Sequence, residues 1–379
     1  MTKKLTLAYL ILLLLLGLFS YTQIDLNLTL SAWPPYQAVQ QQLIQLGYFH
    51  RPLNALIYFS IYLLLTIYYL LFVNLASRGR LTLRAIKTLI GLTGAILLPA
   101  YPAFSHDLFN YIFDVKILLI YHQNPFKYRP LDFPDDLWTR FMHWTHRTFP
   151  YAPFWLVLCA PFLVLGFGKF ILTFFNFKLL ALLGYWASTV LIYKISQKLK
   201  LSKPLLPVVL WSFNPLVIFE GLIAGHLDLH MAVFSLAGLW FLLSSRRLLA
   251  GLFWLLAAGI KFVPLIFLPA LAVKLKPFKL IKLLSLLSLL FLLGYSIYKE
   301  PQPWYWLLPL SLTIFLPRTD FLKRFLLCLS LLQPLTYLPF FYLGDYTYPV
   351  RLVKWASLVL AFLPVLVWQL TDRKIHSRS

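Results

Sequence analysis

Acidic residues and cysteine are scarce in this sequence. Only 12 of its 379 residues are Asp or Glu, against 34 Lys and Arg, and charged residues of both signs make up 12% of the chain. Soluble domains carry about 25% charged residues, so the composition excludes an ordinary soluble protein. The two cysteines, Cys159 and Cys328, lie in apolar surroundings and give neither a disulfide framework nor a metal-ligand spacing.

The sequence also lacks the motifs of several common active sites. It contains no glycine-rich phosphate loop, no nucleotide-sugar signature and no Ser-His-Asp spacing. A substrate activated by a cytosolic nucleotide is therefore not expected. There is no tandem repeat and no low-complexity linker, so residues 1–379 are predicted to form a single domain.

Long apolar runs are what the sequence has in abundance. It is 60% hydrophobic with a mean hydropathy of +0.77, and several runs approach the ~20 residues that cross about 30 Å of hydrocarbon. Each such run must be a helix, because unpaired backbone groups are untenable in lipid. We predict an all-α polytopic membrane protein with about ten to twelve spans. The clearest runs are residues 5–20, 53–75, 205–222 and 350–370.

The basic residues indicate the topology. Although the formal charge of +22 could suggest nucleic acid, the Lys and Arg form short clusters between apolar runs and no continuous stripe. The positive-inside rule places these clusters, and both chain ends, in the cytoplasm. We expect a plasma-membrane protein without a nucleic-acid partner, whose first apolar run is retained because it lacks a cleavage pattern. The clusters are residues 3–4, 78–87, 194–203, 246–247, 274–282, 318–324 and 373–378.

Acidic residues follow the opposite pattern, because only Asp320 and Asp372 of the 12 fall on the cytoplasmic side. A site is therefore expected on the outer side, where residues 105–168 form a long loop. Within it we predict an amphipathic surface helix over 108–121 and a re-entrant or juxtamembrane helix over 154–166, followed by a crossing over 170–193. Residues 248–273 are basic at both ends, so they are predicted to form a hairpin or broken helix that carries Lys261 toward the outer half of the membrane.

The first group of candidate residues begins the predicted surface helix. Asp107, Tyr111 and Asp114 are spaced by four and three residues and so share one helical face. A carboxylate there, next to His106 and close to low-dielectric surroundings, can act as a general base on a hydroxyl. The alternatives are that Asp107 caps the helix and that Asp114 pairs with Lys116 or a solvent ion.

The second group follows Asn214-Pro215 and contains Glu220, His226, Asp228 and His230. Ionisable groups at membrane helix ends are functional candidates. The spacing of the two histidines could suit a metal, but Leu227 stands where a zinc hydrolase motif needs Glu, so a polar lining for a lipid headgroup is the main interpretation.

Lys261 and the aromatic run over residues 302–306 are the remaining candidates. An intramembrane ammonium needs an anion, which would be either a lipid phosphate or an internal partner such as Glu220 or Asp228. The aromatic run begins a predicted outer helix end, where such residues are either interface anchors or the wall of a sugar or isoprenoid site.

Several of these motifs, in this order, resemble GT-C glycosyltransferases, and more narrowly the polyprenol-phosphate-mannose-dependent, alpha-1,6-type mannosyltransferases. The similarity spans roughly residues 95–310. Three positions depart from the usual family pattern: His122 replaces a Gly, Ala152 replaces the Gly of Tyr-Gly-Pro, and Leu227 replaces the Asn of His-Asn-Asp. The motifs are Ser105-His106-Asp107-Leu-Phe-Asn-Tyr111, Gln123-Asn124-Pro125-Phe126, Phe149-Pro150-Tyr151-Ala152-Pro153-Phe154-Trp155, Asn214-Pro215-Leu216, Glu220, Gly225-His226-x-Asp228, Leu249-Ala-Gly251, Gly259-Ile-Lys261-Phe-Val-Pro264 and Pro303-Trp304-Tyr305.

The resemblance implies transfer of a hexose, with mannose expected, from a polyprenyl-phosphate donor to a hydroxyl of a glycan or glycolipid on the outer face of the membrane. It implies Asp107 as the base and Asp114 as a second carboxylate. A divalent cation, Mg²⁺ or Mn²⁺, could assist, with no residue assigned to it. In the same reading Lys261, His226 and His106 hold the lipid phosphate, and Tyr111, Tyr151, Glu220 and Asp228 line or position the sugar and acceptor.

Two other classes of protein fit the same composition. A lipid-linked-sugar transporter or flippase would move the same molecules without covalent chemistry, but it usually shows matched interrupted helices in two halves, and only one interrupted helix is predicted. A non-catalytic membrane scaffold would leave the outer acids without a shared pocket.

Overall fold

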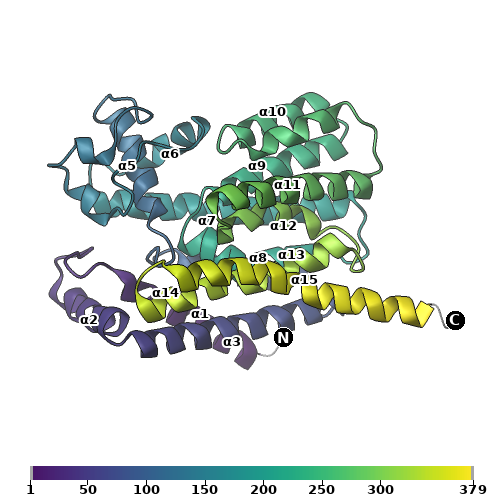
Figure 1. Cartoon of the computed structure of the whole chain (residues 1–379), viewed down its shortest axis with the longest axis horizontal. Helices are drawn as coiled ribbons and strands as arrows, with labels where there is room; N and C mark the ends of the chain where they lie inside the picture. Colours follow the sequence, from purple (N-terminus) through teal and green to yellow (C-terminus); the bar gives the residue numbers. More distant parts are fainter. Residues whose placement is uncertain (1–2, 377–379) are drawn as a thin grey trace.

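The computed structural model describes the backbone of residues 3–376 and the side chains to residue 363 and at 365. In that range the chain forms helices joined by turns and loops, and no strand occurs (Figure 1). This confirms the all-α prediction. The α-helices are α1 (Lys3–Ser20), α2 (Pro34–Ile44), α3 (Arg51–Ser77), α4 (Leu83–Leu97), α5 (Asp107–Leu119), α6 (Phe154–Val164), α7 (Phe170–Lys198), α8 (Leu205–Ser212), α9 (Asp228–Leu243), α10 (Arg247–Ala258), α11 (Pro277–Lys299), α12 (Leu307–Thr313), α13 (Phe321–Leu332), α14 (Tyr337–Leu343) and α15 (Tyr348–His376). The shorter helical turns are η1 (Tyr21–Gln23), η2 (Gln45–Phe49), η3 (Pro130–Asp132), η4 (Leu137–Phe141), η5 (Val217–Ile223), η6 (Val263–Leu271), η7 (Pro303–Trp306) and η8 (Gln333–Thr336).

Five continuous helical stretches are long and apolar enough to cross a bilayer, and one bent pair could provide a sixth span. The protein is therefore an integral membrane protein. Within the residues that the structure describes, other apolar runs form helices of only 11 to 16 residues, such as α6 and α9, below the ~20 that a straight span requires. The total of ten to twelve spans stays a prediction. The five stretches are Lys3–Gln23, Arg51–Ser77, Phe170–Lys198, Pro277–Lys299 and Phe321–Leu343.

The helix α3 shows how one span divides between protein and lipid. Tyr58, Leu65 and Phe72 recur every seven residues and are buried, whereas Leu56, Leu63 and Leu70 recur at the same interval and are exposed. Positions seven apart return to nearly the same face after two turns. A helix with apolar residues on its exposed face as well as its buried face is suited to lipid rather than water.

The predicted span over residues 205–222 is broken in the structure. The helices α8 and η5 meet at an angle of 67°, because the residue before a proline is pushed away from helical geometry. The side chain of Asn214 stabilises the break: its amide donates to Ser330 Oγ at 2.8 Å, and its carbonyl accepts from the Leu216 N–H at 2.9 Å. The predicted helix over residues 205–222 is therefore interrupted by a bend, and this bend sets the direction of η5, the turn that carries Glu220.

The predicted helix after Ser105 is present as α5, but protein covers it on all sides over its first nine residues; its location at the outer membrane surface stays a prediction. Every residue from Asp107 to Val115 is buried, and α5 packs against α6 and α7. The long loop that follows α5 supplies hydrogen-bond partners for its polar side chains. For example, Asn110 Nδ2 donates to the Trp144 carbonyl at 3.1 Å. The apolar spacing indicated the helix correctly, but the partner that covers its polar face is distant in sequence.

The broken helix predicted over residues 248–273 is confirmed. The helix α10 ends at Ala258, a turn follows over 259–262, and η6 begins at Val263. This turn is tied to the start of α6, since the Ala152 N–H donates to the Ile260 carbonyl at 3.2 Å and the Phe154 N–H donates to the Gly259 carbonyl at 2.8 Å. The predicted crossing over residues 170–193 is also present as α7. In Figure 1, α2, α5 and α6 gather at one end of the molecule.

We predict that Asn214→Ala destabilises the protein by about 1–3 kcal/mol, because the Leu216 N–H and the Ser330 hydroxyl lose a buried partner. Thermal unfolding in detergent measures the change. Asn74→Ala, at an exposed position near the end of α3, serves as the control, and equal losses for the two variants would contradict a special role for Asn214.

Candidate active site

A cavity of about 710 Å³ lies between the start of α5, the turn over residues 259–262, α11, η7 and the α14–α15 region. Charged and polar groups line one part of its wall, and aromatic and aliphatic side chains from α11, α14 and α15 line another. Of the predicted site residues, His106, Asp107, Tyr151 and Lys261 line this cavity. The scaffold alternative expected the outer acids to share no pocket, whereas Asp107 and Glu300 both line this cavity.

Asp107 is the first residue of α5 and is largely buried, with its side chain 6% exposed. Its backbone N–H donates to Ser105 Oγ at 3.2 Å. One carboxylate oxygen is 3.6 Å from Arg147 Nη2, and the other is 3.8 Å from His226 Nδ1. The capping alternative is wrong, because His106 occupies the cap position and makes no side-chain cap bond.

His226 connects Asp107 to a second buried carboxylate. Its Nε2 is 3.3 Å from Glu220 Oε2, and Tyr337 donates a hydrogen bond of 2.7 Å to Glu220 Oε1. The imidazole also stacks on the indole of Trp304, with ring centroids 4.0 Å apart. This aromatic residue therefore packs within the site and lines the cavity, as the wall interpretation of residues 302–306 predicted.

Gly225 gives His226 its position. Its φ of +70° is a backbone conformation that residues other than glycine rarely adopt. A Cβ at this position would also lie 2.9 Å from Leu108 Cδ1. Glycine is therefore favoured at this turn, which passes close to the first turn of α5. The Gly-His pair of the motif thus has a physical basis: the glycine permits the close approach that brings His226 to Asp107.

Lys261 reaches the cavity from the turn between α10 and η6. Its ammonium contacts both oxygens of Asp228, at 2.9 and 3.2 Å, and lies 4.7 Å from the ring centroid of Tyr305 and 6.0 Å from that of Tyr151. The internal ion pair considered as an alternative is present. It does not remove Lys261 from the cavity, whose wall includes this side chain.

Tyr111 and Asp114 lie behind the cavity wall. Tyr111 meets Tyr151 edge-on, with ring centroids 5.7 Å apart. Asp114 is 3% exposed, and burial raises the pKa of its carboxyl well above the usual range, with Arg147 opposing the shift and Asp107 adding to it. The predicted pairing of Asp114 with Lys116 is wrong, because Lys116 binds Asp136 instead.

The two histidines of the second motif have different surroundings. His226 faces Glu220 and Asp107, whereas His230 Nε2 is 3.0 Å from the Leu180 carbonyl. The structure therefore does not bring them together as metal ligands. A different group could hold an ion: one ligand atom from each of Asp25, His106 and His143 lies within 4.8 Å of the others.

Arg147 and His143 line the cavity but were not singled out from the sequence. Both belong to the irregular segment between η4 and α6, where there is no helical spacing to interpret. The available signal was charge: Arg147 is one of the 12 basic residues, out of 34, that lie outside the predicted cytoplasmic clusters, and the positive-inside rule disfavours basic residues in outer loops.

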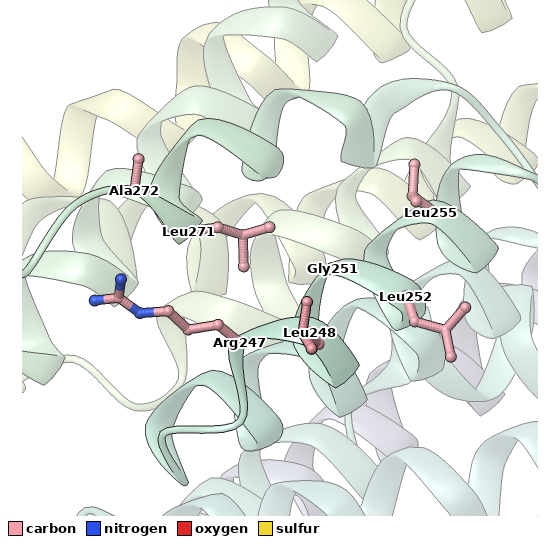
Figure 2. Close-up of a pocket in the computed structure, with 7 residues that line it drawn as sticks. All are labelled: Arg247, Leu248, Gly251, Leu252, Leu255, Leu271 and Ala272. Carbon is pink, nitrogen blue, oxygen red and sulfur yellow. The ribbon is translucent and has the colours of Figure 1, made fainter.

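A second depression, between α10 and η6, has a different chemical character. Figure 2 shows Leu248, Leu252, Leu255 and Leu271 around it, with Arg247 at one end. Its lining offers no carboxylate, imidazole or hydroxyl. A surface of this kind on a membrane protein suits contact with lipid, so the candidate active site is the cavity beside Asp107.

Comparison with protein families identifies a relationship for most of this chain. The MptA_B family, described as alpha-(1->6)-mannopyranosyltransferase, N-terminal domain, matches residues 14–276. Curated proteins and solved structures give no match. Since the match covers well over half of the chain, this protein belongs to the alpha-(1->6)-mannopyranosyltransferase family. It is therefore a glycosyltransferase of the GT-C type that uses a sugar donor and a glycan acceptor, which favours the enzyme over the flippase.

We predict that the melting temperature of Asp114→Asn, measured relative to that of the natural protein, increases as pH rises from 4 to 8. The raised native pKa means that folded Asp114 keeps a proton which the unfolded chain releases above its ordinary pKa of ~4, so the free energy of unfolding falls with rising pH. Asparagine has no such proton. Melting temperatures of both forms across this range measure the difference.

The control for this experiment is Asp135→Asn at an exposed position of the loop between η3 and η4. Its melting temperature should follow that of the natural protein across the same pH range. A constant or shrinking difference between Asp114→Asn and the natural protein would contradict the buried, protonated state of Asp114.

Proposed function

We propose that this protein transfers mannose from a polyprenyl-phosphate donor to a hydroxyl of a glycan or glycolipid on the extracytoplasmic side of the plasma membrane, with both termini in the cytoplasm. The observation that carries the proposal is that the Asp107 carboxylate and the Lys261 ammonium line the same cavity. A base and a cation are the two groups needed for attack by a hydroxyl with departure of a phosphate.

Asp107 takes the proton of the acceptor hydroxyl. The acceptor oxygen then forms a bond to the anomeric carbon of the sugar while the bond between that carbon and the phosphate oxygen breaks, and the electron pair leaves with the polyprenyl phosphate. Attack from the face opposite the phosphate inverts the anomeric carbon. Glu220 and His226 act as positioning residues, because the His226 imidazole lies between the Glu220 carboxylate and the Asp107 carboxylate and contacts both.

Cationic groups on the cavity wall stabilise the negative charge that develops on the phosphate. Lys261 is the first of these groups. Its ammonium is held in place by Asp228 and lies beside the rings of Tyr151 and Tyr305. Arg147 lies 3.6 Å from Asp107 and supplies a second cation beside the base. Tyr151 is placed to contact the sugar between them. In a site with restricted access to water, such preorganised charges act strongly on the transition state.

The shape of the cavity favours a lipid donor. Phe262, Phe291 and Tyr295 line it and are also 63, 42 and 38% exposed. Phe291 and Tyr295 belong to α11, one of the candidate spans, and Phe262 immediately precedes η6, which packs against α11. This mouth therefore opens beside a helix that faces lipid, so a polyprenyl chain could stay in the bilayer while its phosphosugar enters the cavity.

Asp107→Asn keeps the size of the side chain but removes the base, so we predict that kcat falls by about 10²–10⁴-fold with little change in KM for the donor. The assay follows release of polyprenyl phosphate from polyprenyl-phosphate-mannose with an acceptor glycolipid. Asp135→Asn is the matched control in an exposed loop and should retain full activity. Unimpaired turnover by Asp107→Asn would remove Asp107 as the base.

Phe291→Asn should raise KM for a long-chain donor by roughly tenfold or more, because loss of a buried apolar contact is worth about 1.5–3 kcal/mol. A short-chain, water-soluble donor should be affected much less. Leu290→Asn, at the adjacent exposed position of α11 that does not line the cavity, controls for a polar group on the lipid face. Equal effects on both donors would argue against entry of the lipid at this mouth.

A further inference from the structure

The residues Asp25, His106 and His143 come from three separate parts of the chain. Asp25 follows η1, His106 precedes α5, and His143 follows η4. Each presents one oxygen or ring nitrogen, and these three atoms lie within 4.8 Å of one another. A carboxylate and two imidazoles are together the ligand set of many transition-metal sites.

The contacts within this cluster keep its members oriented. His143 Nε2 is 3.6 Å from Asp25 Oδ1, and its ring stacks on His106 with centroids 3.7 Å apart. Two tyrosines hold the cluster from behind: the Tyr101 hydroxyl is 3.2 Å from His106 Nε2, and the Tyr48 hydroxyl donates to Asp25 Oδ1 at 3.3 Å. Metal-binding histidines usually keep such a hydrogen bond at their other nitrogen.

We propose that Asp25, His106 and His143 form a binding site for one divalent transition-metal ion of the Zn²⁺ class, open toward the active-site cavity. Two imidazoles favour such an ion over Mg²⁺, which prefers oxygen ligands and keeps its waters. Bonds of about 2.1 Å bring ligand atoms of one ion to roughly 3–3.5 Å from each other, so the cluster has to contract. The two imidazole rings are stacked face to face, so one ring also has to turn before both ring nitrogens point at one ion.

His143 can provide this contraction. It lies in the irregular loop after η4 with its side chain 46% exposed, so its ring is free of tight packing on one side. His106 is buried, and it marks the fixed part of the site. Because both histidines line the cavity, the unfilled coordination positions of an ion held here would face the space beside Asp107, where an anionic oxygen could bind.

The test uses the full-length protein in detergent, purified with a tag that contains no histidine and treated with a chelator. Zn²⁺ alone is the probe, and elemental analysis after gel filtration gives the number of ions retained. We expect one Zn²⁺ per chain, a rise in melting temperature on Zn²⁺ addition, and no such rise with Mg²⁺.

His143→Ala and Asp25→Asn should each weaken Zn²⁺ binding at least tenfold and abolish the thermal shift, and both sites are exposed enough for the variants to fold. His146→Ala removes an exposed histidine of the same loop that is outside the cluster and should bind Zn²⁺ normally. Absence of Zn²⁺ binding, or binding that survives both His143→Ala and Asp25→Asn, would overturn the proposal. No sugar donor is used, so the result is independent of the proposed mannose transfer.

Discussion

The ion pair between Lys261 and Asp228 is the contact on which the arrangement of the cavity depends. A charge held away from water needs an opposite charge close by, and this pair satisfies both partners at 2.9 Å while joining the turn after α10 to the first residue of α9. The same turn is hydrogen-bonded to residues 152 and 154 at the start of α6. One electrostatic requirement therefore holds three elements around the cavity.

A second group of buried polar side chains connects that arrangement to Asp107. Tyr337, Glu220, His226 and Asp107 follow one another from α14 through η5 and the Gly225 turn to α5. In a low-dielectric interior each of these groups is expensive to bury alone, so their mutual contacts constrain where the helices can sit. The bend at Asn214 is part of the same constraint, because a straight span could not direct η5 to this position.

Some of this could be predicted from sequence and some could not. The membrane helices, the broken helix at Gly259 and the grouping of Asp107 with Lys261 followed from apolar runs, basic clusters and motif order. The alternatives in which Asp107 caps α5 and Asp114 pairs with Lys116 were wrong. Partners distant in sequence decided the surroundings of α5: the loop that follows it covers its polar face, and Asp136 of that loop binds Lys116.

By itself the sequence determined the class of protein, the broken helix near Gly259 and the residue types available for chemistry, because these depend on local composition and on proline and glycine geometry. Its order of motifs also identified the family. Only the tertiary structure decided which carboxylate faces the cavity and which is buried behind it, and that Asp25, His106 and His143 converge. Such choices arise from packing between segments far apart in the chain, on which local patterns carry no information.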